Sequence, residues 1–267
     1  MPYNAANLVA WWDAGYNARP SGSAQFTSAN SEQLTVADNA DISLDGTSFT
    51  VCGFALWDTL GDHFPFAKAT GDNNASELAC AINGSGTLHA NCYSGNTLYQ
   101  ILHASSIAAG IWHFLLMEFD ATTETFEFFV DGVSAGTQDM TGNAVNSTST
   151  KLALGSRSDD LLFHNGRLAK WYLWHRVLTA DEKASVRNGG NGKYEFELTT
   201  AEKVDLKASW HLNEASGTRS DSTGSNDLAD GNTVTANNGP RVEMAEDSSG
   251  SGNHGQLGGF DSNEPSA

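Results

Sequence analysis

Between residues 48 and 178 the chain is a succession of short apolar runs separated by turn residues. The pairs Asn83-Gly84 and Asp131-Gly132 lie between consecutive runs, and such pairs are typical of β-hairpins. Many short strands with almost no helical pattern predict two stacked antiparallel sheets, as in a β-sandwich or jelly roll. The runs with strand character cover residues 49–57, 78–82, 88–93, 98–103, 112–119, 126–130, 151–155 and 167–174.

The run 112–119 is apolar on both of its faces, because Phe114 and Leu116 alternate with Leu115 and Met117. This pattern indicates a central strand that is covered on both sides. Two capping boxes, Thr179 with Glu182 and Thr199 with Glu202, predict two short helices, the first near residues 180–188. The predicted fold is therefore all-β with two short helices and an irregular C-terminal extension.

The charge is strongly acidic, with 32 Asp and Glu against 14 Lys and Arg and a net charge of −18. Such a surface repels phosphate and anionic lipid, which argues against nucleic-acid partners and membrane binding. It attracts hard divalent cations, although solubility alone also explains an acidic surface. No stretch of 18 apolar residues and no signal-peptide pattern is seen, so we expect no membrane insertion.

Three cysteines, Cys52, Cys80 and Cys92, form no pair with zinc-ligand spacing. Cys80 and Cys92 flank a hairpin turn, so either a disulfide between them or buried free thiols fit the sequence.

Several segments resemble laminin-G-like, concanavalin A-like jelly-roll domains. Residues 112–114, 119–125 and 129–132 resemble the core hairpin of that family, and residues 165–182 resemble its closing strand and short helix. Residues 24–36 and 48–51 fit its early strands, so the resemblance spans residues 24–188. It implies two stacked antiparallel sheets, a frequent Ca²⁺ site at the rim, and roles in glycan or protein binding. Members from bacteria and viruses commonly lie on cell surfaces or virions.

The family's opening strand and loop occur more than once. Residues 8–12 resemble the opening strand, and residues 206–214 resemble a second copy of it. We therefore predict a jelly-roll domain at 1–198 and an extension at 199–267 that docks on a sheet, in the same chain or in a neighbour. A degenerate second domain in tandem is the alternative.

Two Asp-Ser-x-Gly loops, at residues 221–226 and 247–255, are candidate Ca²⁺ sites, because carboxylate and amide oxygens are ligands that Ca²⁺ prefers. The alternative is an Asx turn, in which Asp bonds to its own backbone. The candidate metal ligands are Asp221, Asn226, Asp230, Asp247 and Asn253.

Aromatic side chains can stack on sugar rings, and most of those here are expected in the core. Trp57 with the adjacent Asp58, and Tyr93, are the predicted ligand-binding residues at the rim.

A cluster at Glu118, Asp120 and Glu124 resembles the acids of laminarinase-type glycosidases. Its third acid follows a turn and cannot share one strand face with the others, so no catalytic residue is predicted.

We therefore predict a non-catalytic structural or binding module of an extracellular or virion surface, such as a decoration or fibre-type protein. It would recognise a glycan or a surface protein and would self-associate through residues 199–267. The alternatives are a Ca²⁺-dependent carbohydrate-binding adhesin module and, more remotely, a glycosidase.

Overall fold

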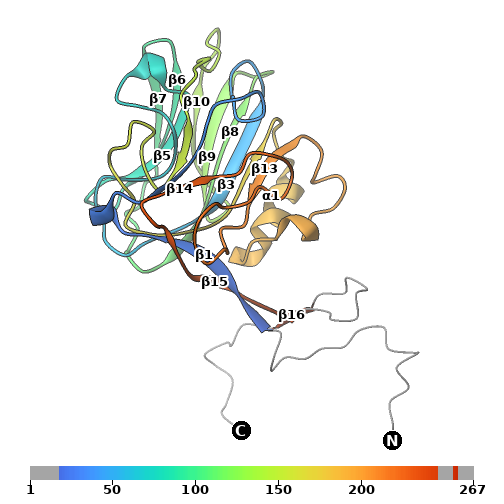
Figure 1. Ribbon diagram of the computed structural model, residues 1–267. Coiled ribbons are helices and arrows are strands. Elements are labelled where there is room, and N and C mark those ends of the chain that lie inside the picture. The colour runs from blue at the N-terminus through green and yellow to red at the C-terminus, as the bar shows by residue number, and fades with distance from the viewer. Residues whose placement is uncertain (1–17, 246–254, 258–267) are drawn as a thin grey trace, which may run out of the picture.

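The computed structural model describes residues 18–245 and 255–257, which form two stacked sheets (Figure 1). All strand pairings within these residues are antiparallel. Sheet I has the order β10 (Val133–Asp139), β9 (Thr125–Val130), β8 (Trp112–Asp120), β3 (Phe49–Trp57), β12 (Gly166–Trp174), β1 (Ala18–Phe26), β15 (Thr235–Ala245) and β16 (Gly255–Leu257), with β13 (Leu206–Trp210) also paired to β12. Sheet II has the order β14 (Ala229–Gly231), β2 (Gln33–Val36), β11 (Leu152–Leu154), β4 (His63–Lys68), β5 (Leu78–Ile82), β6 (Leu88–Ser94) and β7 (Thr97–Leu102). The predicted all-β sandwich is confirmed.

The main core fills the space between the two sheets. Phe66 of sheet II stacks on Trp171 of sheet I, with ring centroids 5.5 Å apart. Gly53 of β3 lies under the same indole, and a Cβ at this position would come within 2.2 Å of the Trp171 ring. Close packing of this ring therefore requires glycine at position 53.

The outer face of sheet I is also buried, under α1 (Ala180–Arg187) and the segment that follows it. Phe54, Phe114 and Trp174 belong to a second apolar cluster on this face. The Trp174 indole donates to the carbonyl of Glu202 at 2.7 Å, which ties the covering segment to the sheet. The strand β8 is thus covered on both sides, as its sequence predicts.

A buried lysine holds the covering segment as well. The Lys170 ammonium donates to the carbonyls of Asn191 and Gly192, at 2.8 and 2.9 Å, and lies 4.3 Å from the centre of the Tyr194 ring. Burial lowers the pKa of Lys170 to about 8. The segment also includes two 3-10 helices, η4 (Asn188–Gly190) and η5 (Glu195–Glu197). Two more, η2 (Ser28–Asn30) and η3 (Asn73–Ala75), lie in other loops.

The second predicted helix is wrong. Thr199 and Glu202 do form capping-box hydrogen bonds, but residues 200–205 are turns. Asp205 adopts a left-handed φ of 55°, and β13 begins at the next residue. Because β13 pairs with β12 from residue 206 onward, the capping box is followed by only one helix-like turn.

The C-terminal region contributes strands to both sheets of its own chain. Its first strand, β13, pairs with the C-terminal half of β12, while β1 pairs with the N-terminal half of the same strand. Then β14 pairs with β2 in sheet II, and β15 pairs with β1 in sheet I. Pairing between copies and the division at residue 198 stay predictions. The predicted opening strand at residues 8–12 lies outside the described residues.

Cys52, Cys80 and Cys92 are buried free thiols. None of the helices in the described part of the chain is long and apolar enough to cross a membrane.

Candidate functional site

The loop at Asp221 is tied to the backbone around it. Asp221 Oδ1 accepts from the amides of Ser209 and Thr223 at 2.9 and 3.0 Å and from the Thr223 hydroxyl at 2.7 Å. Its Oδ2 accepts from the amide of Asn226 at 3.2 Å. This is the Asx-turn arrangement, and it fixes the loop against β13.

The neighbouring candidates also have structural partners. The Asn226 side chain donates to the carbonyl of Lys207 at 3.2 Å and accepts from Asn39 at 2.9 Å. The Asp230 carboxylate accepts from the amides of Val234 and Gly217 at 2.9 and 3.1 Å. Within residues 18–245 and 255–257, no group of three or more His, Cys, Asp and Glu side chains could hold a metal ion. Calcium binding by these residues stays a prediction, and Asp247 and Asn253 lie outside the described residues.

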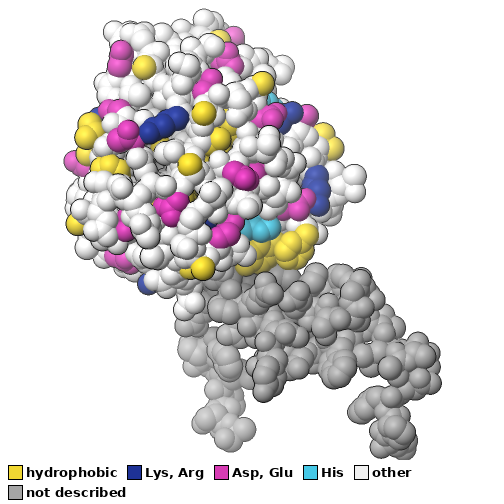
Figure 2. Space-filling model, viewed as in Figure 1, with side chains coloured by type: hydrophobic (Ala, Val, Ile, Leu, Met, Phe, Trp, Pro, Cys, Tyr) yellow, Lys and Arg dark blue, Asp and Glu magenta, His cyan; other side chains and the backbone are white. Residues whose placement is uncertain are grey.

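Carboxylates are spread over the visible face of the molecule rather than gathered in one patch (Figure 2). The net charge of −18 therefore does not indicate a single cation site on this face.

The three predicted ligand residues do not form one site. Trp57 is fully buried in the main core, so its predicted place at the rim is wrong. Its ring packs edge-on against His164, with centroids 5.6 Å apart. Asp58, on the exposed side, accepts from Gln25 at 3.0 Å. Tyr93 lies on β6 of the other sheet, where it belongs to a small cluster on the outer face.

The outer face of sheet II carries small and polar side chains at the centre of the sheet. The core-facing residues of its strands include Leu154, Phe66 and Cys80, so their neighbours along each strand point outward. The strand registers place one row of outward positions across the sheet. That row runs Ala229, Thr35, Ala153, Ala67, Ala79, Asn91 and Gln100.

The loop 156–163 folds over one half of this face. The Ser158 hydroxyl donates to the carbonyl of Ala67 at 3.0 Å and accepts from the amide of Ala69 at 3.1 Å. Its neighbour Arg157 forms a forked ion pair with Asp159, with N–O distances of 2.7 and 2.8 Å. The fork fixes the plane of a guanidinium at the border between the covered and the uncovered half.

Polar groups converge on Tyr93 at that border. Burial raises the pKa of Tyr93, while a hydrogen bond with the Asn91 side chain and the charge of Arg157 act in the opposite direction. The Gln100 side chain in turn donates to Asn91 at 2.9 Å. The phenol of Tyr93 and the amides of Asn91 and Gln100 thus lie on β6 and β7, and the guanidinium of Arg157 lies beside them.

This arrangement suits recognition of hydroxyl groups. The amides offer both donors and acceptors, and the guanidinium offers several donors in one plane. We define Tyr93, Asn91, Gln100 and Arg157 as the polar border of sheet II.

The acids that resemble a glycosidase cluster lie elsewhere and serve other purposes. Glu118 is buried and pairs with Lys183 at 2.6 Å. Asp120 accepts from the amide of Thr122 at 2.8 Å, and Glu124 accepts from the amide of Gly142 at 2.7 Å. Each carboxylate thus stabilises a different part of the backbone or the helix packing.

The fold and sequence also place the chain among known proteins. The sequence profile of the concanavalin A-like lectin/glucanases superfamily matches residues 27–184. The chain belongs to this superfamily. The resemblance found in the sequence is thus confirmed. No curated protein sequence matches the chain.

Several solved structures align with this chain at low sequence identity, and the first of them shows the same fold. A candidate carbohydrate-binding protein from Bacteroides ovatus aligns with a TM-score of 0.62 and 14% identity, over 82% of this chain and 60% of that one. This chain therefore spans less than two thirds of that relative. A heptameric pentraxin from Limulus polyphemus aligns with a TM-score of 0.48 and 15% identity, over 65% and 84% of the two chains. The CBM40 of the Ruminococcus gnavus IT-sialidase, bound to sialyllactose, aligns with a TM-score of 0.45 and 12% identity, over 57% and 92%.

Proposed function

We propose that this protein is a non-catalytic binding module that recognises glycans through the polar border of sheet II. The observation that carries the proposal is the contrast between the two outer faces. The outer face of sheet I is covered by α1 over an apolar cluster, whereas the outward row of sheet II ends in Asn91 and Gln100 beside Arg157. The Bacteroides ovatus structure, which is a candidate carbohydrate-binding protein, supports the same class of function.

The chemistry of the polar border fits a glycan better than a protein surface. Protein interfaces depend on large apolar side chains at their centre, and the centre of this face is alanine. Sugar hydroxyls need closely spaced donors and acceptors instead, which the linked side chains of Gln100, Asn91 and Tyr93 supply.

A glycan array probed with the full chain tests this proposal. We expect defined hits, and we expect Arg157→Gln to weaken the best hit by about tenfold or more, because a hydrogen bond from a charged group is lost. Lys203→Gln is the matched control. It removes one positive charge from the segment covering sheet I, where Lys203 pairs with Glu195 at 2.6 Å, and it should leave glycan binding unchanged.

The proposal fails if no glycan binds, or if Arg157→Gln and Lys203→Gln bind every hit equally well. Circular dichroism and melting curves of both variants show whether a loss of binding reflects a loss of folding.

A place on a virion or cell surface, as a decoration or fibre-type accessory, is the finer part of this proposal. Self-association through residues 199–267 would use the edges where β13, β14 and β15 pair, because exchange of these strands between copies keeps the same pairings. Native mass spectrometry of the full chain tests it: a fixed oligomer supports assembly, and a monomer at all concentrations argues against it.

A further inference from the structure

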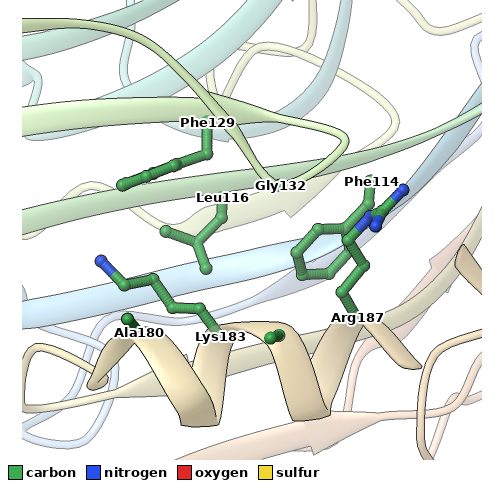
Figure 3. A pocket seen from close by; sticks show the side chains of 8 residues that line it. Phe114, Leu116, Phe129, Gly132, Ala180, Lys183 and Arg187 are labelled. Atoms are coloured by element: carbon green, nitrogen blue, oxygen red, sulfur yellow. The ribbon is translucent and has the colours of Figure 1, made fainter. Parts of the chain in front are cut away.

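A pocket of about 210 Å³ lies on the opposite sheet, between α1 and the outer face of β8 and β9 (Figure 3). Phe114, Leu116 and Phe129 line its sheet side, and Lys183, Ala184 and Arg187 line its helix side. Figure 3 shows Lys183 and Arg187 reaching from α1 toward opposite ends of the pocket, with Leu116 between them.

The pocket exists because α1 presents small side chains where the sheet presents large ones. Ala180 and Ala184, one helical turn apart, face this gap. The helix is held elsewhere, by the buried Val186 and by the capping box at its start. The contact between helix and sheet at Phe114 and Phe129 is therefore underfilled, unlike the close-packed main core.

The cation at one end of the pocket already has a partner. The Lys183 ammonium lies 2.6 Å from Glu118 Oε1 and 4.4 Å from the centre of the Phe129 ring. Lys183 thus supplies a side wall, and Glu118 neutralises much of its charge.

The cation at the other end has unused hydrogen-bonding capacity. Arg187 Nε is buried and has no hydrogen-bond partner in the described part of the chain. The Arg187 side chain lies against Gly132, where a Cβ would be 3.2 Å from its Cδ and 3.5 Å from its Nε. Its charge acts on Asp131, but that carboxylate already accepts from His113 and from the amide of Phe114, at 2.7 and 2.9 Å. A buried donor without a partner is costly, and a ligand acceptor would remove that cost.

We propose that this pocket binds a carboxylate carried on a single six-membered ring. Arg187 would bind the carboxylate, and the ring would lie against Leu116 and the two phenyl groups. The volume is below the range of drug-sized pockets, which points to one ring rather than an extended ligand. A planar guanidinium matches a carboxylate in geometry, and the aromatic side chains match an apolar ring face.

The ring can come from two sources with the same chemistry. One is a uronic acid unit of a glycan, and the other is a free cyclic or aromatic acid. The inference is independent of the proposed glycan site, because the two sites lie on the outer faces of different sheets.

Titration of the full chain with D-glucuronate, benzoate and D-glucose tests the inference, with binding read by ligand-observed NMR and calorimetry. We expect at least one of the two acids to bind with a dissociation constant of about 1 mM, as suits a ligand with so few atoms. D-glucose, which lacks the carboxylate, should bind at least about tenfold more weakly. Binding of glucuronate alone identifies a glycan source, and binding of benzoate alone identifies a free acid.

Two variants locate the site. Arg187→Gln should weaken the acid by about tenfold or more, and Ala184→Leu should block it by filling the pocket. Lys203→Gln, whose cation pairs with Glu195 outside the pocket, should leave acid binding unchanged. The inference is overturned if neither acid binds at about 20 times the expected dissociation constant. It is also overturned if glucose binds as well as glucuronate, or if Arg187→Gln binds the acids like the unchanged protein. Arg187→Gln leaves the pocket walls in place, so this variant tests the inference even if Ala184→Leu does not fold.

Discussion

The outer faces of the two sheets have the same strand geometry and opposite side chains. On sheet I, Phe54, Phe114 and Trp174 point outward and are buried by α1 and the segment behind it. On sheet II, the corresponding central positions are Ala67, Ala79 and Ala153, and the loop 156–163 crosses that face. Both faces are assembled from strands that alternate side chains between two sides.

Side-chain size at the outward positions thus decides what each face can do. Large apolar residues need a cover, and here α1 and the segment that follows it bury most of that face. The alanines of sheet II are buried as well, and so are Asn91 and Tyr93, whereas Gln100 and Arg157 at the border are partly exposed. The two outer faces therefore differ in what covers them: a helix over large apolar side chains on sheet I, and a loop over small and polar ones on sheet II.

The largest expected difference between the faces is in stability. Trp174→Ala should lower the free energy of unfolding by about 3–5 kcal/mol, because it leaves a cavity under the covering segment. It also removes the indole hydrogen bond to Glu202. Denaturant unfolding followed by circular dichroism measures the change.

Gln100→Ala is the counterpart on sheet II. It loses only the hydrogen bond to Asn91, so we expect a cost of no more than about 1.5 kcal/mol. Equal costs for the two variants would show that the outer face of sheet II is as structural as that of sheet I.

Acid should destabilise the covered face of sheet I. His211 packs against Tyr194 and Phe196 of the covering segment, and its Nε2 accepts from the amide of Glu195 at 3.1 Å. Burial lowers the pKa of His211 from 6.5 to about 4. Between these values the unfolded chain binds a proton that the folded chain does not, so stability falls as pH falls. The loss should be about 1.4 kcal/mol for each pH unit in the window from 6.5 to 4.

His211→Gln should reduce the slope of the stability profile in that window, as measured by denaturant unfolding at several pH values. Some slope should remain, because burial also lowers the pKa of His164 in the main core, to about 3. His89→Gln is the matched variant on sheet II, where burial also lowers the pKa of the imidazole. If His89→Gln flattened the profile as much as His211→Gln, acid sensitivity would belong to both faces.

Most of the fold could be predicted from the pattern of apolar runs and turn residues in the sequence. The structure places β3 and β5 at the expected bounds, because period-two runs bounded by turn residues leave little choice of register. The same pattern also explains why the prediction of Trp57 at the rim was wrong. Within β3 it lies two residues from Ala55 and six from Val51, both of which face the main core, so strand parity alone places its ring inside.

Only part of the candidate site could be predicted from the sequence. Tyr93 was predicted as a ligand residue, although for its place at a rim rather than its place on β6. The outward alanines Ala67, Ala79 and Ala153 are small enough for a loop to lie close over them, and all three are buried. Arg157 could not be found in this way, because its position depends on how a loop folds back over strands distant in sequence.

The smallest expected effect concerns the alternative site, at the Asp221 loop. If Ca²⁺ bound there with its concentration 100 times the dissociation constant, the ion would add about 2.7 kcal/mol to stability, and removing it would lower the melting temperature by several degrees. The Asp221 carboxylate, however, already accepts four hydrogen bonds from Ser209, Thr223 and Asn226. We therefore expect excess EDTA to shift the melting temperature by less than about 1 °C. A larger fall that added Ca²⁺ reverses would show that the loops of the C-terminal strands bind an ion. The contrast between the two sheet faces would then not be enough to explain the location of the binding site.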